Sequence, residues 1–186
     1  MNASSVQYNN IFVKGDGLFD TISGLSSVNN GPGVYLTNKG ISGATDKQYA
    51  SLYLIMDTVV SPGNGVNTGS AGQVQEVFDI SNIPMQKWVH IALRMQNKIM
   101  DVYVNGTVTK RQIFINIPKQ NYNDIIVSGN GGFNGKLSNL RYFAHALNAL
   151  EIGSVLAQGP NTNPISNISK PGSMQYLSMS WYSTNQ

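Results

Sequence analysis

The stretch "KWVHIALRMQNKIMDVYVNG", residues 87–106, has the most regular pattern in the chain and decides its fold class. Apolar side chains take every second position of each half: Val89, Ile91, Leu93 and Met95, then Met100, Val102 and Val104. A period of two indicates a β-strand with one face in a core. The polar residues 96–98 and the pair Asn105–Gly106 predict tight turns. The stretch therefore predicts two antiparallel strands that lead into a third.

The same signals predict an all-β chain with one short helix. Strands are expected within residues 9–17, 33–39, 47–60, 73–80, 107–115, 123–130, 137–143 and 174–182, with a turn at 81–86. The helix should span residues 148–157, because Asn148 and Glu151 have the spacing of a capping box and Gly159–Pro160 ends it. Many short strands with turn signals between them indicate a two-sheet antiparallel β-sandwich with jelly-roll topology. We expect residues 1–158 to form the sandwich, and 159–186 to add a polar segment and a final strand to the same domain.

The composition excludes several classes of function. The chain has 186 residues, 41% hydrophobic but only 11% charged, with a net charge of +3 and no cysteine. It lacks the basic stripe that nucleic-acid binding needs, so no nucleic-acid partner is expected. No apolar run is long enough to cross a bilayer, and no disulfide or thiolate metal site can form.

The opening stretch also carries a family resemblance. It resembles the core of concanavalin A-like jelly rolls of the laminin G and pentraxin type, and "NDIIVSGNGGFNGKLSNLRYFAHALNALEI" (123–152) is similar to the next section of that family. "GPGVYL" (31–36), "GPN" (159–161) and "YLSMSWY" (176–182) resemble the version of this domain in virion proteins of nucleocytoplasmic large DNA viruses. This resemblance implies a non-enzymatic structural or binding module. It would be a minor capsid protein located in the virion, in contact with other capsid proteins.

The acidic residues argue against an enzyme. Glucanases of this fold carry their carboxylates in an E-x-D-x-E arrangement on one strand, and retaining hydrolysis needs two carboxyl groups roughly 5 Å apart. The chain lacks this pattern, and Glu76 and Asp79 would point to opposite faces of a regular strand. Asp101 is interpreted as a strand-surface residue or a turn anchor. Trp88 and His90 are interpreted as packing residues that the fold itself explains.

Calcium is the one cofactor that the resemblance suggests. Laminin G and pentraxin relatives often hold calcium at the loops that rim the sandwich, through Asp, Asn and carbonyl oxygens. Asp16, Asp46 and Asp57 are the candidate ligands. They match no fixed ligand spacing, and solvated or turn-forming aspartates are the favoured interpretation.

The competing hypothesis is a lectin that recognises glycans on a cell surface, with or without calcium. Such a protein would be extracellular or on the cell surface. A sugar site needs an aromatic stacking face beside amide and carboxylate groups. The candidate residues are Tyr35, Tyr49, Tyr53 and Tyr122.

Overall fold

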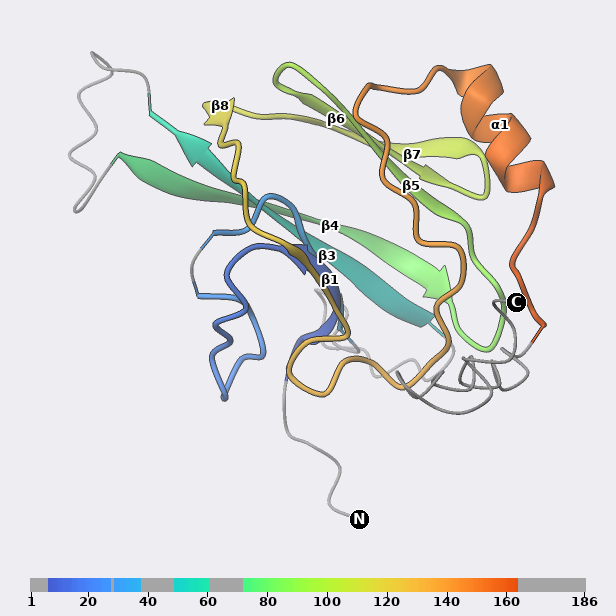
Figure 1. The fold of residues 1–186 in the computed structure, drawn as a ribbon, viewed down its shortest axis with the longest axis horizontal. Coiled ribbons are helices and arrows are strands. Elements are labelled where there is room, and N and C mark those ends of the chain that lie inside the picture. The colour runs from blue at the N-terminus through green and yellow to red at the C-terminus, as the bar shows by residue number, and fades with distance from the viewer. Residues whose placement is uncertain (1–6, 28, 38–48, 61–71, 164–186) are drawn as a thin grey trace, which may run out of the picture. The chain divides into compact units, whose positions relative to one another are not determined.

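The computed structural model describes residues 7–27, 29–37, 49–60 and 72–163. The chain divides into two compact units, Met1–Lys136 with Arg141–Gly159, and Leu137–Leu140 with Pro160–Gln186. All the strands and the helix of the described residues belong to the first unit (Figure 1). In the second unit, the hydroxyl of Ser138 bonds to the backbone of Asn161. The predicted completion of the sandwich by residues 159–186 stays a prediction.

The larger sheet has six antiparallel strands in the order β4-β3-β2-β1-β9, and β8 pairs with β3. Its strands are β1 (Asn9–Lys14), β2 (Gly33–Thr37), β3 (Tyr49–Val59), β4 (Gln73–Pro84), β8 (Ile117–Pro118) and β9 (Ile125–Val127). The longest pair runs from Tyr49 opposite Pro84 to Val59 opposite Gln73. This long β3–β4 ladder fixes which side chains meet on each face of the sheet.

The smaller sheet consists of β5 (Ile91–Gln96), β6 (Ile99–Val104) and β7 (Thr107–Ile113), in that order. Its two turns use left-handed residues. Asn97 has a φ of 55°, and Asn105 and Gly106 have φ values of 50° and 81°. Asparagine and glycine tolerate this conformation, which two-residue hairpin turns require. The three strands predicted around residues 87–106 are confirmed.

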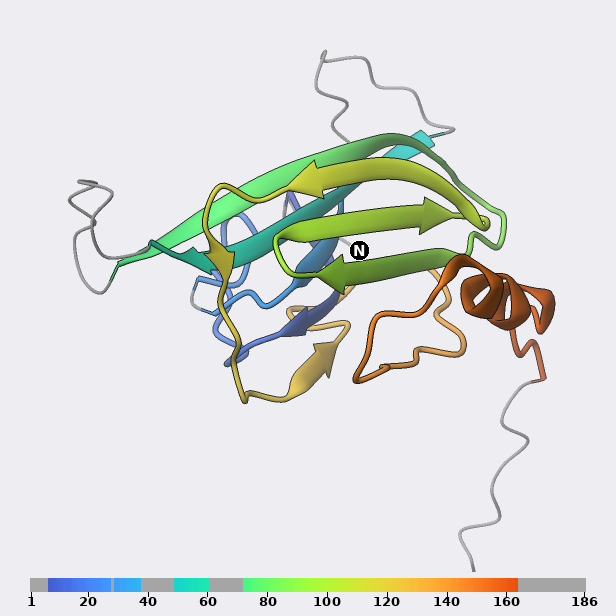
Figure 2. The ribbon, with the colours of Figure 1, turned by 90° about the horizontal axis from the view of Figure 1, so that it is seen from above.

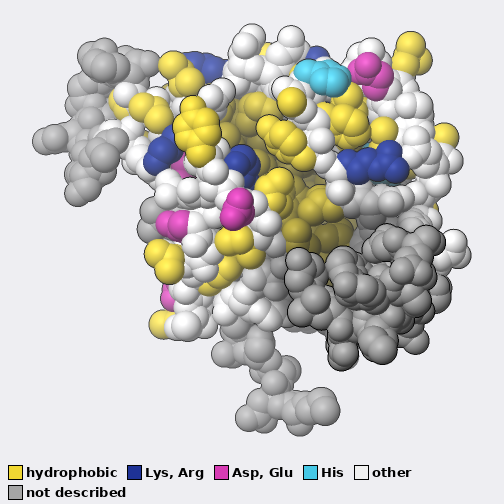
Figure 3. Space-filling view, in the orientation of Figure 1, with side chains coloured by type: hydrophobic (Ala, Val, Ile, Leu, Met, Phe, Trp, Pro, Cys, Tyr) yellow, Lys and Arg dark blue, Asp and Glu magenta, His cyan; other side chains and the backbone are white. Residues whose placement is uncertain are grey.

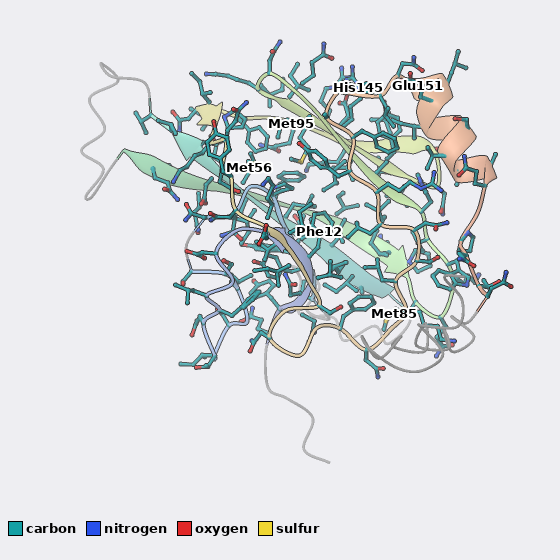
Figure 4. All side chains as sticks on the ribbon, in the orientation of Figure 1. Phe12, Met56, Met85, Met95, His145 and Glu151 are labelled. Atoms are coloured by element: carbon teal, nitrogen blue, oxygen red, sulfur yellow. The ribbon has the colours of Figure 1, made fainter. Side chains whose placement is uncertain are left out.

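The hydrophobic core lies between the two sheets, which form two layers (Figures 1 and 2). Its buried members are Val34, Leu52, Leu54, Met56, Phe78, Ile80, Ile83, Met100, Val102 and Phe114. Hydrophobic side chains gather around a hollow in the middle of the view in Figure 3. Phe12 of β1 and Met95 of β5, labelled in Figure 4, pack against the core from the two sheets and stay partly exposed. The architecture is the predicted two-sheet β-sandwich.

The predicted helix is α1 (Ala149–Ala157). The Asn148 side chain accepts a hydrogen bond from the Glu151 N–H at 2.9 Å, and the Glu151 carboxylate accepts one from the Asn148 N–H at 2.7 Å. This reciprocal pair is the predicted capping box. Gly159 follows the helix with a φ of 66°. The described residues contain no helix with the length and apolarity that crossing a bilayer requires.

Two local predictions were wrong. Residues 81–84 continue β4 instead of forming a turn, because the strand absorbs an irregularity at Asn82, whose φ is 63°. Residues 137–143 form no strand, since Asn139 has a φ of 52° and a left-handed residue interrupts an extended backbone. The predicted final strand, 174–182, lies outside the described residues.

Candidate functional site

Two tyrosines meet on the face of the larger sheet that points away from the core. Leu52 and Leu54 face the core, so Tyr53 between them faces outward. The ring of Tyr8, just before β1, lies 4.6 Å from the ring of Tyr53 between centroids, at an angle of 37°. Both side chains are half-buried. Together they make a small aromatic surface on the outward face of the sheet.

A carboxylate borders this aromatic surface. Asp79 of β4 lies directly opposite Tyr53 of β3, and its Oδ2 accepts a hydrogen bond from the Ser81 hydroxyl at 3.4 Å. Burial raises the pKa of Tyr53, and electrostatic interactions with Tyr8 and Asp79 raise it further. The Tyr53 hydroxyl is therefore protonated at neutral pH and can donate a hydrogen bond. We call Tyr8, Tyr53, Asp79 and Ser81 the tyrosine patch.

Tyr35 does not belong to the tyrosine patch, although it neighbours Tyr53 across β2 and β3. Its side chain is completely buried. The hydroxyl accepts the N–H of Ser26 and donates to Asn30 Oδ1, each at 2.9 Å. Burial raises the pKa of Tyr35 to about 12. Tyr35 therefore fastens Ser26 and Asn30 to the sheet, and in the described structure its buried side chain presents no surface to a ligand.

The remaining tyrosine candidates are not brought to the patch by the described structure. Tyr122 is 96% exposed and lies in the connection from β8 to β9, shortly before Ile125, which pairs with Lys14 at the opposite end of β1 from Tyr8. Tyr49 begins β3, but its side chain lies outside the described structure. Tyr8, Asp79 and Ser81 were missed in the sequence. The cross-strand pairing of Tyr53 with Asp79 links residues that are far apart in the chain, and only the β3–β4 register reveals it.

The calcium candidates Asp57 and Asp16 lie near one polar cluster at the end of β3. Asp57 is buried, and its Oδ2 accepts the Asn30 N–H at 2.8 Å and the Gln73 side-chain amide at 2.7 Å. Its Oδ1 has no hydrogen-bond partner in the described structure. Asp16 is exposed, and its Oδ2 accepts the Asn29 side-chain amide at 3.5 Å. The third candidate, Asp46, lies outside the described residues.

Burial is the main influence on the charge of Asp57, and it raises the pKa of this carboxyl. The Asn30 N–H and the positive charge of Lys119 act in the opposite direction and lower that pKa. The Lys119 ammonium is part of the same cluster, where it donates to Asn29 Oδ1 at 2.9 Å and to Gln73 Oε1 at 2.7 Å. Lys119 belongs to no recognisable sequence motif, so the sequence alone did not identify it as part of this cluster.

Asp101 is a buried ion-pair residue, and its interpretation as a strand-surface or turn residue was wrong. It is 1% exposed. Its carboxylate accepts hydrogen bonds from Arg94 Nη1 at 3.3 Å and from Arg111 Nε and Nη2 at 2.6 and 3.0 Å. The hydrogen bond from Arg111 is the main reason that the pKa of Asp101 lies below its usual value. Through Asp101 of β6, the two arginines link β5 and β7.

The other singled-out residues show no catalytic arrangement. Glu76 faces the same side as the core residue Phe78, whereas Asp79 faces the other side, as predicted. The Glu76 carboxylate accepts the N–H groups of Ile115 and Asn116, both at 2.9 Å. Its two oxygens therefore anchor the chain between β7 and β8.

Trp88 and His90 are only partly covered, and Trp88 is 46% exposed. His90 exchanges hydrogen bonds with Asn105: its N–H donates to Asn105 Oδ1 at 2.9 Å, and its carbonyl accepts the Asn105 N–H at 2.8 Å. Burial lowers the pKa of the His90 ring. These backbone contacts brace the end of the β5–β6 hairpin. The ring Nδ1 of His90 is buried without a hydrogen-bond partner in the described structure, and the packing role of the Trp88 and His90 side chains stays a prediction.

Exposed isoleucines form a second unusual surface. Ile113, Ile115 and Ile117 are 64%, 79% and 53% exposed, whereas Phe114 between them is buried. Alternation thus places three branched apolar side chains in water along one short segment. Large apolar side chains gathered on a surface often mark contacts with another protein.

Comparisons with known proteins agree with the fold. A family model described as the concanavalin A-like lectin/glucanases superfamily matches residues 26–153, a stretch that contains β2 to β9. No curated protein sequence matches the chain. Among solved structures, residues 221–444 of an S-layer domain-containing protein from Clostridium thermocellum match with 18% identity and a TM-score of 0.33. The match covers 84% of this chain and 66% of that one, and so distant a likeness carries no argument about function.

Proposed function

This chain belongs to the concanavalin A-like lectin/glucanases superfamily, and we propose that it is a non-enzymatic module that binds a glycan at the tyrosine patch. The observation that supports this function is the pair of half-buried rings, Tyr8 and Tyr53, beside the carboxylate of Asp79. Such a module would act outside the cell or at a cell surface.

The chemistry of the tyrosine patch suits a sugar. The apolar C–H face of a pyranose ring can stack on a tyrosine ring, whose hydroxyl remains available for a hydrogen bond. An ionised carboxylate accepts hydrogen bonds and can therefore bind two neighbouring sugar hydroxyls. Tyr53 and Asp79 supply both groups from adjacent strands. Because both lie on regular strands, the protein holds them in place before the ligand arrives.

A glycan array with the whole chain, in the presence and absence of EDTA, tests the proposal. The strongest hit is then titrated by calorimetry against wild type, Tyr53→Ala and Tyr122→Ala. We expect Tyr53→Ala to weaken binding at least about tenfold, the effect of losing roughly 1.4 kcal/mol of stacking and hydrogen bonding. Tyr122→Ala is the matched control, because it removes an exposed tyrosine away from the patch.

Two results would contradict the glycan proposal. One is an array without saturable binding, and the other is equal weakening by Tyr53→Ala and Tyr122→Ala. Circular dichroism of Tyr53→Ala shows whether the sheet stays folded, so that a lost ligand is not confused with a lost fold.

A second candidate is a structural role in an assembly, as the resemblance to virion proteins of large DNA viruses implies. Its support is the exposed row of Ile113, Ile115 and Ile117. In this case the partners are other capsid proteins, and the native location is the virion. Immunolabelling of the native particle or cell tests the role, and a protein found only at a cell surface would contradict it.

A further inference from the structure

The Lys119 ammonium occupies the centre of the polar cluster that contains two of the calcium candidates. Its Nζ lies 2.9 Å from Asn29 Oδ1 and 2.7 Å from Gln73 Oε1. The backbone of the same residue is also fixed, because the Lys119 N–H donates to the Asp57 carbonyl at 2.8 Å. Side chain and main chain therefore hold this lysine at the end of β3.

Each amide that accepts from Lys119 turns its NH₂ group toward a carboxylate. The Gln73 amide donates to Asp57 Oδ2 at 2.7 Å, and the Asn29 amide donates to Asp16 Oδ2 at 3.5 Å. Two amide side chains thus connect one ammonium to two aspartates. The Lys119 ammonium therefore interacts with both carboxylates through the intervening amides. Its positive charge also lowers the pKa of Asp57, which burial raises.

A calcium ion does not fit this arrangement. Calcium takes six to eight oxygen ligands at about 2.3–2.6 Å. The two amide oxygens here already accept from an ammonium, and the Oδ2 atom of each aspartate already accepts from an amide nitrogen. Asp57 Oδ1 has no partner in the described structure, but one such oxygen is far fewer than the ligands that calcium needs. Among the described residues, no three His, Cys, Asp or Glu side chains gather in a way that could hold an ion. A divalent ion would also be repelled by the ammonium itself.

We propose that the Lys119 ammonium is the permanent cation of this cluster, so that the described segments around it need no calcium. Lys119 holds the segments around Asn29 and Gln73 on the end of β3, which is the task that a bound ion would otherwise perform. The expectation that glycan binding persists in EDTA rests on the proposed function. The expectation that EDTA leaves the stability of the fold unchanged does not rest on it.

Thermal unfolding in calcium chloride and in EDTA tests the proposal without any sugar. The proteins are wild type, Lys119→Met and the control Lys87→Met, which removes an exposed lysine elsewhere. We expect the same Tm for wild type in both solutions. Lys119→Met should melt at least about 4 °C lower in EDTA, because charge-assisted hydrogen bonds are lost in a domain of this size. Lys87→Met should match wild type.

A calorimetric titration of wild type with calcium chloride is the second measurement, and it does not depend on the folding of any variant. Flat heats are expected. Saturable heats, or a wild-type Tm that rises in calcium, would overturn the proposal, as would a Lys119→Met protein that melts like Lys87→Met. Failure of the glycan array alone would leave these results unchanged, so the two proposals fail separately.

Discussion

Phe114 and Ile115 are neighbours in the chain and should respond in opposite ways to truncation. Phe114 is 2% exposed, lies in the core between the sheets, and meets Phe78 edge-on with centroids 6.3 Å apart. Ile115 is 79% exposed. Phe114→Ala should therefore strongly reduce the free energy of unfolding, whereas Ile115→Ala should leave it almost unchanged.

The expected loss for Phe114→Ala follows from two physical contributions. Burying a phenylalanine side chain stabilises a protein by about 1.5–3 kcal/mol, and the cavity left by truncation adds to the loss. The aromatic contact with Phe78 contributes about 0.5–1.5 kcal/mol more. We therefore expect about 3–5 kcal/mol, a large share of the roughly 5–15 kcal/mol that holds a domain folded. Ile115→Ala should change stability by less than about 0.5 kcal/mol.

Equilibrium unfolding in urea measures both changes. The midpoint should fall for Phe114→Ala while the slope of the transition stays the same, and the Tm should drop by roughly 6–20 °C. The reasoning fails if Phe114→Ala costs less than about 1 kcal/mol, or if Ile115→Ala costs as much as its neighbour. The second outcome would mean that the isoleucine side chains are already covered in solution, by another part of the chain or by a second copy.

Three further changes test other parts of the structure. The pKa of Asp101 is lowered in the folded protein, so the ion pair stabilises the fold fully above the unfolded pKa of about 3.9, and this stabilisation is lost as pH falls through the folded pKa. The difference in the free energy of unfolding between wild type and Asp101→Asn should therefore shrink in that acid range. A difference that stays constant with pH would refute the ion pair. Asn148→Ala should cost about 1 kcal/mol through loss of the helix cap, measured by urea unfolding, whereas Asn148→Asp should cost little. Tyr35→Phe removes two buried hydrogen bonds and should cost about 1–3 kcal/mol in the same assay.

Alternation along single strands was enough to predict the sandwich. The strands around residues 87–106 follow from their apolar period and from turn residues that favour left-handed conformations. The helix follows from its cap. The strand predicted at residues 137–143 does not form because Asn139 adopts a left-handed conformation. The sequence does not show which asparagine takes that conformation. Patterns within one segment are therefore readable, and single backbone exceptions are not.

The candidate sites were much less predictable, because their residues meet across the fold. Tyr53 was named as a candidate, but its partners Tyr8 and Asp79 come from other elements. Asp57 and Lys119 are brought together by the pairing of β8 with β3. Sequence can name a residue type that suits a chemistry. Only the register of the sheets decides which types become neighbours.

Asp101 shows how sharply register decides a contact. The turn after β5 pairs Gln96 with Ile99 and so places Arg94 opposite Asp101, as counting from the turn predicts. Counting from the Asn105–Gly106 turn in the same way would place Lys110 opposite Asp101. A bulge between Val102 and Tyr103 shifts the β6–β7 register by one residue, and Arg111 takes that position instead. A bulge redirects the side chains of one strand toward the other face. The contact of both arginines with the buried Asp101 therefore depends on one extra residue in β7, and a change at the bulge should break the Arg111–Asp101 ion pair without removing any of its charges.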